Sequence, residues 1–96
     1  MLKSNSVDSI LQAYSGRLAV MFSAPWCKPC GPVKKILDSV CADRQVPAFL
    51  IDTDQNMEEA ERCDVIGLPA IFVFDGGEIV NVLTGDVSET KIREAI

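Results

Sequence analysis

Two cysteines separated by two residues stand between an apolar run and a helical pattern, and this junction limits the folds open to the chain. Residues 18–22 form an uninterrupted apolar stretch, which is typical of a strand buried on both faces. Residues 32–42 repeat apolar side chains with helical spacing, so we expect a helix there. Cys27 and Cys30 therefore lie where a buried strand gives way to a helix.

This junction makes the two thiols chemically unequal. The unpaired N–H groups and the dipole at a helix N-terminus favour negative charge, and the thiolate is the reactive form of cysteine. We expect Cys27, at or just before the first helical turn, to have a lowered pKa and to act as the nucleophile. Cys30 lies one turn along, on the apolar side of the helix, and is expected to be the more shielded sulfur. The pair can close a short disulfide with little backbone movement.

A C-x-x-C pair also occurs in zinc and haem sites, which the sequence disfavours. Zinc usually needs four ligands, yet the chain has no histidine, and Cys41 and Cys63 do not form a second such pair. Haem attachment needs histidine after the second cysteine, where Gly31 stands. The remaining alternative is a pair of ordinary core cysteines, which the strand–helix context makes less favourable than redox chemistry.

Other segments complete an α/β pattern. The helical stripe that begins at Val7 has Ser6 as its expected N-cap and Gly16 just past its end. Further elements are expected as a strand at 48–51, a short helix to about residue 62 capped by Asp54 or Asn56, a hairpin around 75–77 and a last helix from Ser88. The sequence gives little support for a strand before Ser6. We predict one three-layer domain over residues 1–96, with a central mixed sheet flanked by helices and a first strand that is short or missing.

Several motifs, in order along nearly the whole chain, resemble the thioredoxin family. Ala24-Pro25-Trp26-Cys27-x-Pro29-Cys30 is similar to its active-site motif, and Val65-Ile66-Gly67-Leu68-Pro69 to its cis-proline loop. Residues 51–56 resemble the strand end before its third helix, residues 70–83 its closing hairpin, and Gly85 the glycine before its last helix.

The resemblance implies a thioredoxin-like fold and a thiol–disulfide oxidoreductase that reduces protein disulfides through Cys27 and Cys30. It implies no metal and no cofactor other than that cysteine pair, and a thioredoxin reductase as the partner that recharges it. It also implies a cis peptide bond before Pro69. The substrate-binding residues that follow from it are Trp26, Lys28, Pro29, Gly67, Leu68, Pro69 and Gly85.

The chain departs from the family pattern at several positions. Met21 replaces a buried aspartate, and Leu50 replaces the lysine that accompanies it, which puts efficient proton transfer from the resolving thiol in doubt. Thr53 and Asp86 alter the apolar docking rim, so partner choice is expected to differ.

Proteins of the family most often have glycine at the position of Lys28 and lysine at the position of Gly31, so the two residue types are exchanged in this chain. A cation beside the pair stabilises the thiolate, so we predict a less reducing potential than that of a typical thioredoxin. The alternative is that Lys28 points into solvent and shifts nothing.

Composition excludes some functions. Fourteen acidic residues against nine basic ones argue against nucleic-acid binding. No apolar stretch approaches the roughly 20 residues of a membrane span, and the first residues lack the pattern of a secretory signal. We therefore expect a cytoplasmic monomer, with no membrane partner, whose thiols are held reduced.

The chain has two cysteines outside the C-x-x-C pair. Cys41 lies on the apolar side of its helix and is expected to be a core residue, whereas the role of Cys63 stays open.

The sequence leaves two alternative functions. A glutaredoxin-like protein recharged by glutathione is the nearest alternative function. A thioredoxin-fold binding module, whose surface matters more than its sulfurs, is the other, and Met21 and Leu50 give it some weight.

Overall fold

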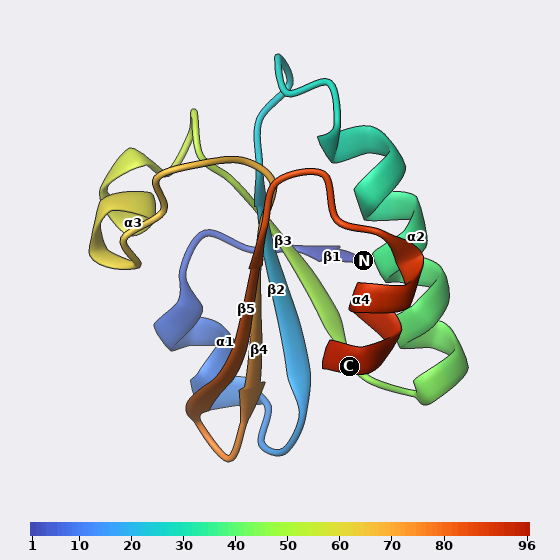
Figure 1. Cartoon of the computed structure of the whole chain (residues 1–96). Coiled ribbons are helices and arrows are strands. Elements are labelled where there is room, and N and C mark those ends of the chain that lie inside the picture. The colour runs from blue at the N-terminus through green and yellow to red at the C-terminus, as the bar shows by residue number, and fades with distance from the viewer.

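A five-stranded sheet with helices on both faces organises the molecule (Figure 1). The computed structural model describes all residues 1–96. The strands are β1 (Leu2–Lys3), β2 (Leu18–Ser23), β3 (Ala48–Asp52), β4 (Ala70–Asp75) and β5 (Glu78–Thr84). Their order is β1-β3-β2-β4-β5, with β1, β3 and β2 parallel and β4 and β5 antiparallel to their neighbours. The sheet is therefore mixed, as the sequence predicted.

Two helices cover each face of this sheet. One pair is α1 (Val7–Ala13) and α3 (Met57–Arg62), and the other is α2 (Cys30–Arg44) and α4 (Glu89–Ala95). In Figure 1 the first pair lies to the left of the sheet and the second to the right. Each pair encloses its own apolar core, because the side chains of successive strand residues point to opposite faces.

Strand β2 lies at the centre of both cores. Every residue from Leu18 to Phe22 is 0% exposed. Ala19 and Met21 point into the core under α2 and α4, whereas Val20 and Phe22 point into the core under α1 and α3. A strand with helices on both faces needs apolar residues at every position, which is why the uninterrupted run predicted it correctly.

Serine side chains cap two helices, at Ser6 as expected and also at Ser88, which the sequence gave only as the start of the last helix. The Ser6 side chain accepts a hydrogen bond from the Ser9 N–H at 3.2 Å, and the Ser88 side chain accepts one from the Lys91 N–H at 3.3 Å. Asn56 occupies the N-cap position of α3 without capping it, since its side chain instead donates to the Asp52 carbonyl at 2.9 Å.

Helix α2 is longer than expected at both ends, running from Cys30 to Arg44. The sequence placed its start near Pro32, but proline is tolerated in the first helical turn because the N–H groups there have no intrahelical partner. At the other end the chain leaves the helix through Gln45, whose φ of 56° is left-handed.

The first strand and the hairpin match their predictions closely. Strand β1 has two residues, which pair in parallel with Phe49 and Leu50 of β3. The hairpin loop is Gly76-Gly77, with φ of 61° and 84°. A two-residue loop with positive φ at both positions matches the twist of the flanking strands, and glycine adopts it without strain.

A buried carboxylate joins α1 to α3, and the sequence did not predict it. Glu59 accepts a hydrogen bond from the Val7 N–H at 2.6 Å, at the N-terminus of α1 where negative charge is favourable. Its other oxygen lies 3.3 Å from the Arg62 guanidinium, which also pairs with Asp8 at 2.9 Å. This pairing explains how an acidic residue is accommodated in an otherwise apolar core.

Candidate functional site

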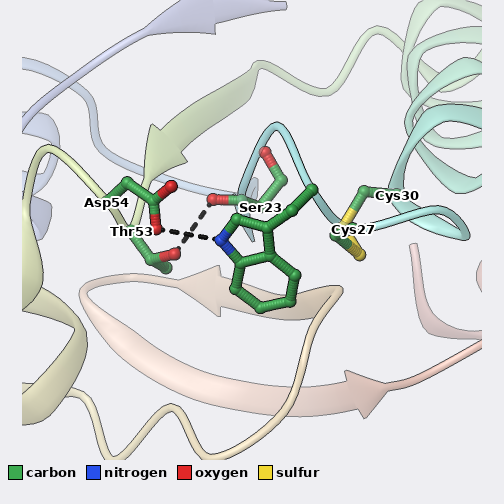
Figure 2. The surroundings of a disulfide bond; sticks show 6 residues. Ser23, Cys27, Cys30, Thr53 and Asp54 are labelled. Carbon is green, nitrogen blue, oxygen red and sulfur yellow. Dashed lines mark hydrogen bonds between the residues drawn. A yellow bond between two sulfur atoms is a disulfide. The ribbon is translucent and has the colours of Figure 1, made fainter.

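Cys27 and Cys30 form a disulfide at the start of α2 (Figure 2). Their Cα atoms lie 5.4 Å apart, and the Cys30 N–H donates to the Cys27 carbonyl at 3.3 Å. Pro29 is the N-cap residue of α2, so Cys27 lies in the turn just before the helix and Cys30 is its first residue. Cys27 is half-buried, whereas Cys30 is only 5% exposed. The two sulfurs therefore differ in access in the order that the sequence suggested.

Trp26 lies on the surface beside this disulfide, with 67% of its area exposed. Its indole N–H donates to a carboxylate oxygen of Asp54 at 3.1 Å, the bond drawn in Figure 2. In the same figure the Thr53 hydroxyl donates to the Ser23 carbonyl at 3.2 Å. Both bonds tie the loop after β3 to the segment that carries the cysteines. The sequence suggested Asp54 only as a helix cap, because a contact across 28 residues leaves no local signal.

The loop that contains Pro69 lies at the same end of the sheet as the disulfide. The Leu68–Pro69 peptide bond is cis, as the resemblance implied. Ala70, the next residue, pairs with Phe22 near the end of β2 that leads to the cysteines. Pro69 is buried, and its carbonyl accepts a hydrogen bond from the Gly85 N–H at 2.9 Å. The segments carrying the predicted substrate-binding residues are therefore brought to one end of the molecule.

Several of these segments also expose apolar or backbone groups to solvent. Ile66 is 98% exposed, and Gly67 beside it is exposed as well. Leu68 is partly buried and packs against both apolar cores. Ile66 was not among the predicted binding residues, since the sequence gave no sign that this side chain would leave the core.

The core packed against Cys30 is apolar. Met21 is 0% exposed and is paired in register with Leu50 on the adjacent strand. Both pack in the core that contains Cys30, where the family pattern has a buried aspartate and its lysine. Cys30 therefore packs against a core without the carboxylate that the resemblance would place there.

The other two cysteines are free thiols. Cys41 is buried in the core, and burial, with a smaller contribution from Asp38, raises its pKa from 9.0 to about 11. Burial, together with the negative charge of Glu59, also raises the pKa of Cys63, which is partly buried. A raised pKa keeps a thiol protonated and unreactive at neutral pH. Cys41 is thus a core residue, as predicted.

The raised pKa of Cys41 leads to a test of stability against pH. Below pH 9 the thiol is neutral in both states, so it does not affect the free energy of unfolding. Between about pH 9 and 11 only the unfolded chain ionises, and stability should fall by at most about 1.4 kcal/mol per pH unit. We expect wild type to lose about 2 kcal/mol more than Cys41→Val between pH 8 and 10.5. Parallel urea-unfolding profiles of the two proteins would contradict this.

No group of three His, Cys, Asp or Glu side chains is placed to hold a metal ion. No helix combines the length and the apolar character that crossing a bilayer requires.

Known proteins are similar to this chain in both sequence and structure. The family model for thioredoxin matches residues 1–96. The thioredoxin of Staphylococcus aureus is 28% identical, covering 100% of this chain and 94% of its own length. Thioredoxin 1 of Nostoc is 28% identical over 79 residues, which cover 80% of this chain and 74% of that protein. The crystal structure of Fasciola hepatica thioredoxin superimposes with a TM-score of 0.87 at 26% identity, covering 98% of this chain and 94% of that one.

The chain belongs to the thioredoxin family. Members of this family work through their own redox-active cysteine pair and act on protein disulfides. The activity of this protein is accordingly that of a thiol–disulfide oxidoreductase, a protein-disulfide reductase.

Proposed function

We propose that Cys27 is the attacking thiol of this reductase and that Cys30 is the resolving thiol. The unequal burial of the two sulfurs carries this assignment, because the attacking sulfur must reach a disulfide on another protein. Cys27 attacks the substrate disulfide and forms a mixed disulfide, and Cys30 then attacks Cys27 and releases the reduced substrate. The position of Cys27 before the N-terminus of α2 favours its thiolate.

The substrate docks on the residues that surround Cys27, in this proposal. An extended segment of the substrate pairs with the Leu68 backbone, as peptides do when they add to an exposed strand or loop. Exposed apolar area at Trp26 and Ile66 supports a protein substrate at this end of the molecule. The docking surface comprises Trp26, Lys28, Pro29, Gly67, Leu68 and Gly85, and the buried Pro69 holds the Leu68 backbone in place beneath it.

The proposal also covers the location of the protein, its oligomeric state and the partner that recharges it. The protein acts as a cytoplasmic monomer of one domain, and a thioredoxin reductase recharges its disulfide at the expense of NADPH. The exposed Trp26 and the cis-proline loop favour this system over glutathione. A glutaredoxin-like role is the second candidate, supported by the basic side chains near the disulfide.

Insulin reduction with two alternative electron donors tests this proposal. NADPH with thioredoxin reductase is expected to sustain turnover, and glutathione with glutathione reductase is expected to sustain little. The reverse result would assign the protein to the glutathione system. A Cys27→Ser, Cys30→Ser double variant that kept full biological function would instead favour a binding module.

Lys28 provides a test of how the active site sets the redox potential. Its side chain is exposed and forms no ion pair, so its charge is free to act on the neighbouring thiolate. Lys28→Gln removes the charge but keeps a polar side chain only one atom shorter. The potential, measured by equilibration with glutathione, should become more negative by about 5–20 mV. Lys35→Gln, which lies within α2 and away from the disulfide turn, is the control, and an equal shift there would show that only overall charge matters.

A further inference from the structure

A cleft of about 470 Å³, lined mostly by polar residues, opens beside the disulfide and is bordered by both Cys27 and Cys30. It lies at the carboxyl ends of the parallel strands β1, β3 and β2. The chain leaves β2 toward the face covered by α2, and it leaves β3 toward the face covered by α3 (Figure 1). Adjacent parallel strands whose connections leave to opposite faces create a crevice, and ligands bind in such crevices in α/β sheets.

The charge of this cleft is opposite to that of the molecule. The chain as a whole has a net charge of −5, yet Lys3, Lys28 and Lys34 line the cleft against a single acid, Asp52. One oxygen of that carboxylate is already occupied by the N–H groups of Asp54 and Gln55, at 2.8 and 3.4 Å. The cleft therefore carries a local excess of positive charge.

The lysines and the arginines of this protein differ in how they are paired. Arg17, Arg62 and Arg93 each form an ion pair with a carboxylate on the protein itself. No lysine forms such a pair. Three of the chain's five lysines thus gather at one cleft with no internal partner, next to the reactive sulfurs.

We propose that this cleft is a subsite for a carboxylate of the disulfide substrate, held by Lys3 and Lys34 while the sulfur reaches Cys27. The proposal rests on Cys27 as the attacking thiol. The volume lies in the range of small-molecule sites, roughly 300–1,000 Å³. Ala24, Pro25 and Leu50 supply apolar wall for the rest of the ligand. A peptide disulfide with carboxylates near its sulfur, of which oxidised glutathione is the simplest probe, has this chemistry.

The exchange reaction balances without any further reagent. The Cys27 thiolate attacks one sulfur of the anionic disulfide, the S–S bond breaks, and the other half leaves as a thiolate. The Cys30 thiol gives its proton to the thiolate that has just left, attacks the Cys27 sulfur and expels the second half, which takes a proton from water. The protein is oxidised by two electrons to its disulfide, and the substrate is reduced to two thiols. The lysines offset the repulsion between an anionic substrate and a protein of negative net charge.

Rates of oxidation of the reduced protein by two small disulfides test the proposal. Oxidised glutathione is anionic, and hydroxyethyl disulfide is neutral. Samples are quenched with acid at successive times, and the free thiols that remain on the protein are counted. The ratio of the anionic rate to the neutral rate is expected to fall about two- to fivefold in Lys34→Gln and in Lys3→Gln. It should fall further in the double variant and in wild type at high salt. The use of a ratio cancels changes in the attacking thiol that are common to both disulfides.

Lys35→Gln is the matched control, because it removes the same charge from the next residue of α2 without lining the cleft. Unchanged ratios in the Lys3 and Lys34 variants, or an equal fall in Lys35→Gln, would overturn the subsite. The proposed function fails separately, if wild type reacts with neither hydroxyethyl disulfide nor insulin.

A peptide arm distinguishes the two sources of the carboxylate. Two disulfide-bridged peptides are compared, one with glutamates beside the cysteines and one with glutamines at the same places. If Lys3→Gln and Lys34→Gln slow only the reaction with glutathione, the subsite serves a small disulfide. If the two substitutions slow the reaction with the glutamate peptide, with or without an effect on glutathione, the subsite serves an acidic segment of a protein substrate. Either result supports a carboxylate subsite.

Discussion

Cys27→Ser is expected to abolish insulin reduction, with a loss of about a thousandfold or more relative to wild type. Serine fills the same space, so the fold around the turn is retained. Its hydroxyl does not ionise near neutral pH and cannot attack a disulfide at a useful rate. The measurement is turnover with dithiothreitol as the electron donor, which needs no reductase and therefore isolates the exchange steps.

Cys30→Ser is expected to have a different consequence, because Cys27 still attacks but nothing resolves the product. The variant should accumulate a mixed disulfide with substrate, which mass spectrometry detects under non-reducing conditions. Cys63→Ser is the control, since Cys63 is a free thiol outside the pair, and it should keep wild-type turnover.

Two results would contradict the division of roles between the sulfurs. One is a substrate trapped on Cys30 in the Cys27→Ser variant. The other is faster labelling of Cys30 than of Cys27 by iodoacetamide in the reduced protein at neutral pH. Either would mean that the burial seen in the oxidised form does not decide which thiol attacks.

Met21→Asp is expected to destabilise the protein by about 3–5 kcal/mol at neutral pH. The substitution restores the residue that the family pattern has here. It does so in a core that lacks the matching lysine, since Leu50 occupies the adjacent register position. Met21 is 0% exposed, so the carboxylate would lose its water without gaining a partner. Small domains are stable by only about 5–15 kcal/mol, so this is a large effect.

Chemical denaturation of matched variants measures this effect. Met21→Leu changes shape without adding charge and should cost less than about 1.5 kcal/mol. The double variant Met21→Asp, Leu50→Lys should recover part of the loss, because the two side chains are paired in register. The destabilisation should also shrink below about pH 4, where the carboxyl of the unfolded chain is neutral too. A single variant Met21→Asp as stable as Met21→Leu would show that water reaches this position.

The elements that the sequence predicted well are those whose physical causes are local. The buried strand β2, the cap at Ser6, the helix start at Ser88 and the Gly76-Gly77 loop all follow from side chains within a few residues of one another. The boundaries of α2 were less well predicted. A proline in the first turn neither starts nor stops a helix, so its position gave no sharp signal.

The contacts that the sequence did not reveal join segments far apart in the chain. The Asp54 carboxylate that holds Trp26, the Glu59 carboxylate that holds α1, and the cleft shared by Lys3 and Lys34 all depend on how the layers pack. In each case a charged residue that is ordinary in its own segment acquires its role from the residues that the fold brings next to it.

Residues 24–30 by themselves determined the chemistry of this protein, because a C-x-x-C pair between a buried strand and a helix sets two unequal thiols within bonding distance. The tertiary structure alone decided what surrounds that pair: an apolar floor of Met21 and Leu50, and a cleft with unpaired lysines. The physical reason is the distance along the chain over which each interaction acts. A turn, a cap or a short disulfide is fixed over a few residues, whereas burial and electrostatic environment depend on every layer packed around a site.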